Sequence, residues 1–209
     1  MARPRTPILS RDRIVTAALG LIDETGTLTL PLLAKRLGVS MSSIYHHMAN
    51  RAEIVEGIRE LLSRDFPRPD PALSWQDEVR RWMRGYRRIM VAHPHLIVEF
   101  SVNPVTNETT LRAYEELAQV LESAEFAPES ILEAITALDS FVCGSALELT
   151  ALEQMWASYA DRDLALGRAQ RAAPWAAHSP EAAFELGLTG LILALERQLP
   201  GQRHQDPTQ

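Results

Sequence analysis

Residues 30–48 contain two short apolar segments joined by a tight turn, and they restrict the local fold more than any other part of the chain. The segment reads LPLLAKRLGVSMSSIYHHM. Gly38 can leave helical dihedral angles, Val39 can fill the angle between two helices, and Ser40 can cap the second helix. The pattern predicts a helix-turn-helix.

The second helix of this motif is expected to have two different faces. Ile44 and Met48 lie four residues apart and are expected to pack against the first helix. The opposite side then carries Ser42, Ser43 and His46. Hydroxyl and imidazole groups on such a helix can hydrogen-bond to base edges in the major groove of DNA. The flanking residues suited to phosphate oxygens are Tyr45, His47 and Arg51.

The charge of the chain is unevenly distributed. The whole sequence has a formal net charge of −6, yet residues 1–64 contain nine Lys+Arg and only six Asp+Glu. The remainder contains twelve Lys+Arg and twenty-one Asp+Glu. A basic N-terminal part on an acidic body is compatible with DNA binding at one end.

Helix start and stop signals divide the first 64 residues into four helices. Serine, threonine and asparagine occupy N-cap positions, and glycine ends the first two helices. The predicted helices cover residues 11–25, 30–37, 41–47 and 51–64.

Three prolines at positions 67, 69 and 71 mark the clearest boundary in the chain, because a helix cannot continue through them. The predicted domains are a helix-turn-helix DNA-binding domain at 1–64, a Pro-rich linker at 65–73, a helical ligand-binding and dimerisation domain at 74–199, and a disordered tail at 200–209.

Beyond the linker the apolar spacing remains helical, and alternation of β-branched residues is nearly absent. The predicted helices cover residues 74–92, 94–103, 107–123, 128–156 and 180–199, with a possible short helix within 157–178. The predicted fold class is therefore all-α.

The stretch from Gly38 to Val55 resembles the DNA-binding domain of the TetR/AcrR family of transcriptional regulators. The resemblance covers about residues 10–64. It implies a DNA-binding unit of three helices, the reading head, which a fourth helix joins to the C-terminal domain. It also implies DNA contacts at Thr29, Ser43, Tyr45, His47 and Arg51. The complete predicted DNA-binding set is Thr29, Ser40, Met41, Ser42, Ser43, Tyr45, His46, His47 and Arg51.

The C-terminal half is similar to the tetracycline-repressor branch of that family, through Ser74-Trp75, residues 86–88 and residues 141–148. In that branch a histidine helps to bind a magnesium-complexed drug. Its place falls at Phe100 here, so the resemblance implies neither tetracycline nor a metal. No cofactor is expected.

Aromatic and sulfur-containing side chains in the body helices are consistent with either an ordinary core or a ligand pocket. Glu148 is either solvated or a ligand contact, and His95 is either a helix cap or part of the pocket. The expected effector is an uncharged or weakly cationic apolar molecule. The predicted ligand-binding residues are Trp82, Tyr86, Met90, His95, Phe100, Phe141, Glu148 and Met155.

The last helix is apolar on more than one face, which predicts burial against a second copy of the chain. A membrane is the alternative for such a helix, but Glu185 lies inside it and the apolar stretch is short. The expected assembly is a homodimer. The expected location is cytoplasmic, because the start MARPRTPILS lacks the apolar core of a signal peptide.

An enzyme is the main alternative from another class. The sequence contains no GxSxG, HExxH, P-loop or dinucleotide fingerprint, and the single cysteine, Cys143, lies in an apolar helix. The His46-His47 pair does not suit a metal, because neighbouring helical residues diverge by about 100°. A DNA-binding regulator without a small-molecule ligand is the second alternative.

Overall fold

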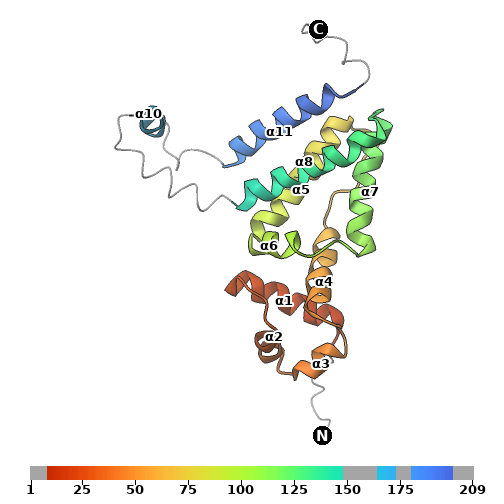
Figure 1. Ribbon diagram of the computed structural model, residues 1–209, viewed down its shortest axis with the longest axis vertical. Coiled ribbons are helices and arrows are strands. Elements are labelled where there is room, and N and C mark those ends of the chain that lie inside the picture. Colours follow the sequence, from red (N-terminus) through yellow and green to blue (C-terminus); the bar gives the residue numbers. More distant parts are fainter. Residues whose placement is uncertain (1–8, 148–163, 173–179, 200–209) are drawn as a thin grey trace. The chain divides into compact units, whose positions relative to one another are not determined.

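The computed structural model describes residues 9–147, 164–172 and 180–199, and every regular element in these ranges is a helix (Figure 1). This confirms the predicted all-α fold class. The described chain divides into two compact units. The first comprises residues 1–66 and 92–115, and the second comprises residues 67–91 and 116–209.

The first unit contains the four predicted N-terminal helices. They are α1 (Arg11–Thr25), α2 (Leu30–Leu37), α3 (Met41–Tyr45) and α4 (Arg51–Ser63). The side chains of Ser10, Thr29, Ser40 and Asn50 accept hydrogen bonds from backbone N–H groups in the first turns of these helices. Gly26 and Gly38 end α1 and α2 with φ of 73° and 68°, a left-handed conformation that favours glycine.

The third helix is shorter than the sequence predicted. It was expected to reach residue 47, but α3 ends at Tyr45, and His46 and His47 lie in the turn that follows. Asn50 has an extended backbone, with φ −160° and ψ 179°, because it caps α4 through a hydrogen bond from the Glu53 N–H. The chain must therefore leave the helix before this cap.

The core of the first unit lies where α1, α2, α3 and α4 meet. Ile14, Ile22, Leu33, Ile44 and Ile58 are all fully buried there. The short helix α6 (His95–Ser101) closes this core with Leu96, which is also fully buried. The N-terminal part of α7 (Glu108–Ser123) follows α6 in the same unit.

The second unit contains α5 (Trp75–Ala92), the C-terminal part of α7, α8 (Pro128–Leu147), α10 (Ala165–Ala172) and α11 (Pro180–Glu196). Ion pairs of Arg84 with Glu185 and of Arg87 with Glu181 join α5 to α11. The rings of Phe141 and Phe184 stack at 5.2 Å between α8 and α11. The predicted disordered tail lies outside the described residues.

Candidate DNA interface and effector site

The outer face of α3 is polar and accessible, and its inner face is fixed in the core. Ile44 is fully buried and Met48 is 1% exposed, while Met41 and Tyr45 are 46% and 48% exposed. The remaining predicted contact residues of this segment are exposed or half-buried: Ser40, Ser42, Ser43, His46 and His47. The structure therefore leaves the predicted DNA-binding side chains of α3 and of the turn after it fully or partly accessible to solvent.

The serine hydroxyls of this surface form a small cluster. The Ser40 Oγ lies 2.8 Å from both the Ser42 Oγ and the Ser43 Oγ, and it also accepts the Ser43 N–H at 3.2 Å. A hydroxyl can rotate to exchange one of these partners for a base or a phosphate. The cap of α3 and its predicted base-contacting groups thus belong to one hydrogen-bonded set.

Thr29 is exposed at the start of α2, where its side chain accepts the Leu32 N–H at 3.4 Å. Thr29 and Pro31 at this end of α2 are both exposed to solvent. Positive partial charge at this end of a helix favours phosphate.

Arg51 has internal partners that the sequence did not suggest. Its Nε donates to the Leu28 carbonyl at 3.1 Å, and its Nη2 lies 2.5 Å from Glu99 Oε1 on α6. Its Nη1 has no hydrogen bond within the described part of the chain. Arg51 therefore joins α4 to α6. Its Nη1 is the nitrogen that remains for the predicted phosphate contact. Glu99 lies 48 residues away in the sequence, so no local signal could have revealed the pairing.

The sequence analysis also did not predict a network of buried charged residues on α4. Glu56 and Arg59 are 8% and 6% exposed on α4 and form an ion pair. Arg59 donates to the carbonyls of Phe100, Asn103 and Pro104 at 2.9, 2.7 and 3.1 Å. The sequence signal was the presence of two opposite charges three residues apart in one helix.

The predicted ligand-binding residues fall into two groups. Trp82, Tyr86, Met90 and Phe141 belong to the second unit, where the first three are almost completely buried. The rings of Trp82 and Tyr86 meet edge to face at 5.2 Å. Trp82 and Tyr86 thus form an aromatic pair within the second unit.

His95 and Phe100 belong to the first unit instead. His95 is exposed, with its ring beside Gly26, and the Phe100 ring packs below the Arg59 guanidinium at 4.6 Å. Glu148 and Met155 lie outside the described residues. The ligand roles of all eight predicted residues stay a prediction.

Cys143 lies on α8 beside this aromatic group. The Tyr86 hydroxyl is 3.5 Å from the Cys143 Sγ. Burial raises the pKa of the Cys143 thiol, and the hydrogen bond from Tyr86 only partly opposes this. The thiol is therefore protonated at neutral pH and is not an activated nucleophile.

Comparison with known proteins agrees with this architecture. Residues 67–199 match the family of tetracyclin repressor-like C-terminal domains. The chain therefore belongs to the tetracycline-repressor family of transcriptional regulators. This confirms the resemblance found in the sequence.

Individual relatives are transcriptional regulators as well. An HTH-type transcriptional regulator of Saccharopolyspora erythraea is 28% identical over 72% of this chain, and the match spans 63% of its own length. The tetracycline repressor protein class E of Escherichia coli is 28% identical over 94% of this chain and 95% of its own.

A solved structure of the Streptomyces coelicolor TetR family protein ActR, in complex with (S)-DNPA, shares the fold. It superposes with a TM-score of 0.73 at 26% identity and covers 90% of this chain and 97% of ActR. These similar proteins are regulators and not enzymes.

Proposed function

We propose that this chain is a homodimeric transcriptional repressor that binds a pseudo-palindromic operator through α3 and releases it when a small apolar molecule binds in the second unit. One observation carries the proposal: Ile44 fixes α3 in the core and Met48 fixes the turn after it, while Met41, Ser42 and Tyr45 of α3 are exposed to solvent. A helix held in this way is the element that reads the major groove in helix-turn-helix proteins.

The exposed side chains have different tasks in this proposal. Ser42, Ser43 and His46 contact base edges and determine the operator sequence, and the Met41 side chain contacts a thymine methyl group. Phosphate contacts fix the position of the head on the duplex. They come from Thr29, Tyr45, His47 and Arg51.

A dimer interface at α8 and α11 is supported by their exposed apolar side chains. Leu132 is 73% exposed on α8 and Leu186 is 77% exposed on α11. Gly144 and Gly190 on the same helices have no atom within 4 Å of an added Cβ. Two such helices meeting their symmetry mates would bury these leucines, as a two-fold interface requires.

The apolar character of α8 is also compatible with a membrane-spanning helix. By length and composition α8 is apolar enough to cross a membrane, and 22% of its apolar window is buried inside the chain. A partner helix explains the same exposed surface in a protein whose relatives are DNA-binding regulators. We therefore assign this surface to a second copy of the chain.

The effector is proposed to bind beside Trp82, Tyr86 and Phe141 of the second unit. These side chains offer a mostly apolar lining, and the Tyr86 hydroxyl offers one polar group. ActR, which has the same fold, holds (S)-DNPA in its crystal structure. Switching requires only that the effector binds more tightly to the form that does not hold the operator.

The test starts with selection of operator fragments from genomic DNA by the purified chain. Binding of the selected operator is then measured against salt concentration. Arg51→Ala is expected to reduce the salt slope by about one unit per subunit, whereas Ser43→Ala is expected to change the preferred base at one position. Arg64→Ala is the matched control, because it removes an exposed cation from the other end of α4.

Release of the operator is tested with the effector that a metabolite screen yields. Trp82→Ala is expected to abolish release while it preserves operator binding. Equal affinity of the chain for all DNA fragments would contradict the proposed repressor function. If the chain bound the operator selectively and no metabolite released it, the chain would be a regulator without a ligand. The effector part of the proposal would then be wrong.

A further inference from the structure

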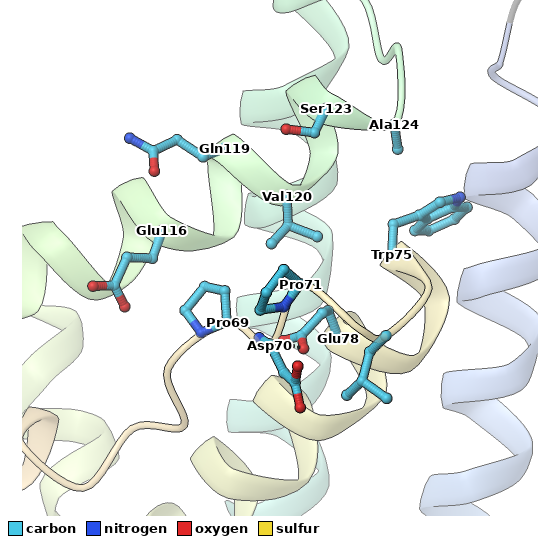
Figure 2. A pocket seen from close by; sticks show the side chains of 11 residues that line it. Pro69, Asp70, Pro71, Trp75, Glu78, Glu116, Gln119, Val120, Ser123 and Ala124 are labelled. Carbon is cyan, nitrogen blue, oxygen red and sulfur yellow. Dashed lines mark hydrogen bonds between the residues drawn. The ribbon is translucent and has the colours of Figure 1, made fainter.

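The second unit contains a hollow of about 480 Å³ between the proline-rich segment before α5 and the C-terminal half of α7 (Figure 2). Its apolar lining consists of Pro69, Pro71, Leu73, Trp75, Val120 and Ala124. The volume lies within the range of sites that hold small organic molecules, about 300–1,000 Å³. None of the side chains predicted to bind the effector lines it.

The polar part of the lining is acidic. Asp70, Glu78 and Glu116 contribute carboxylates, and Gln119 and Ser123 contribute neutral groups. No lysine, arginine or histidine is among the lining residues. An anion in this hollow would therefore face only like charges, whereas a cation would face opposite ones.

One of the three carboxylates is already neutralised. Glu78 is buried, pairs with Arg81 at 2.8 Å and accepts the Asp70 N–H at 2.8 Å. Its role is to hold the linker segment against α5.

The other two carboxylates have no cationic partner within the described residues. Asp70 accepts only the Ala72 N–H, at 3.0 Å, and the Glu116 carboxylate accepts no hydrogen bond from a described group. Among the described residues, two negative charges beside an apolar surface thus have no counter-charge.

The aromatic member of the lining is Trp75. Figure 2 shows Trp75 and Ala124 at one end of the hollow and Glu116 towards the other. Phe126 packs edge to face against the Trp75 ring, with centroids 5.1 Å apart, and so fixes its orientation. A fixed indole ring attracts cations through its quadrupole and also provides apolar contact area.

We propose that this hollow is a second binding site, which takes an organic cation with an apolar body, such as an aryl or alkyl ammonium compound. The prolines, Trp75 and Val120 would contact the apolar body. Asp70 and Glu116 would balance the positive charge. This site goes beyond the proposed effector site and does not depend on operator binding.

The test uses benzyltrimethylammonium as the cation and benzenesulfonate as an aromatic anion of similar size, with the full chain at fixed ionic strength. Binding is followed by the indole N–H resonances of the tryptophans, assigned by single Trp→Phe variants. Saturable binding of the cation is expected to move the Trp75 resonance and to leave that of Trp82 in place. Benzenesulfonate is expected to move neither.

Substitutions then test the two carboxylates. Glu116→Gln and Asp70→Asn are each expected to weaken cation binding about two- to fivefold, the size of a partly exposed ion pair. Glu122→Gln is the matched control, because Glu122 is an exposed carboxylate of α7 outside the hollow. Its affinity for the cation is expected to equal that of the native chain.

Four results would overturn the proposal. The first is equal binding of the cation and the anion, and the second is absence of saturable cation binding in the millimolar range. The third is movement of the Trp82 resonance alone. The fourth is native affinity in both carboxamide variants, whose fold is checked by circular dichroism.

Discussion

The Glu56–Arg59 pair shows how single residues connect α4 to the segment between α6 and α7. Arg59 donates to the carbonyls of Asn103 and Pro104 in that segment and to the carbonyl of Phe100 in α6. The Glu56 Oε1 accepts the N–H groups of Thr106 and Asn107 at 2.9 Å each. A buried charge is tolerated only when it is paired and hydrogen-bonded in this way. Removal of one partner leaves the other charge buried, which costs more than the pair contributes.

Arg59→Met is therefore expected to lower the free energy of unfolding by about 3–5 kcal/mol, the cost of breaking a buried ion pair. Methionine keeps much of the apolar volume of the side chain, so loss of packing contributes little. Urea denaturation followed by circular dichroism measures the change. Arg36→Met is the control, since its pairing with Glu24 is exposed and its loss should leave the midpoint unchanged. Equal urea midpoints for the two variants would show that the buried contacts of Arg59 do not stabilise the fold.

Glu56 should also make stability depend on pH. Burial raises the pKa of its carboxyl, but the hydrogen bonds from Thr106 and Asn107 and the Arg59 charge outweigh this and hold the pKa below its usual value of 4.5. A carboxyl with a lowered pKa stabilises the fold above its unfolded pKa, and the stabilisation is lost as the pH falls through the folded pKa.

The chain should accordingly lose stability as the pH drops below about 4.5. In Glu56→Gln this part of the loss should be missing, although the variant is less stable at neutral pH. Urea midpoints measured from pH 7 to pH 3 would test this. If the urea midpoints of the variant and of the native chain fell in parallel with pH, Glu56 would not contribute to the loss of stability in acid.

At the scale of elements, most helix boundaries could be predicted from their end signals. Ser10, Thr29 and Asn50 do cap α1, α2 and α4, and Pro128 and Pro180 begin α8 and α11. These signals are local, so a single sequence contains them. The early end of α3 was missed because no glycine or proline follows Tyr45 to mark it.

Contacts between elements could not be predicted in the same way. The exposed face of α3 followed from its periodicity, but the pairing of Arg51 with Glu99 joins residues far apart in the chain. The acidic hollow beside α7 was also missed, because its two sides come from separate segments. Such sites depend on packing between elements, which helix periodicity does not specify.

The close packing of α1 on α4 rests on Gly57. A Cβ added at Gly57 would lie 2.6 Å from Val15 Cγ2 in the fully buried core. Gly57→Ala is therefore expected to destabilise the first unit by about 1–3 kcal/mol, the cost of overpacking, despite the better helix propensity of alanine. Thermal unfolding of the variant and of the native chain measures the difference, and a rise in stability for Gly57→Ala would contradict this packing.

At the scale of the whole molecule, α8 and α11 expose apolar side chains that the described residues leave uncovered. Leu147 and Leu193 are more than half exposed, in addition to the leucines already described. Large apolar side chains left exposed in this number indicate an interface. A two-fold dimer would bury it and would also supply two reading heads for the two halves of a pseudo-palindromic operator.

Gly190→Arg is expected to convert the dimer into a monomer. The arginine fits on the isolated chain, since the space around Gly190 is open, and it favours the helix by up to about 1 kcal/mol relative to glycine. Loss of the dimer would therefore come from a bulky charge in the interface and not from unfolding. Sedimentation at micromolar concentration measures the mass, and the monomer should bind a full operator no more tightly than a half-site. Glu122→Arg, on the exposed face of α7, should remain dimeric. A native chain that sediments as a monomer would contradict the proposed assembly.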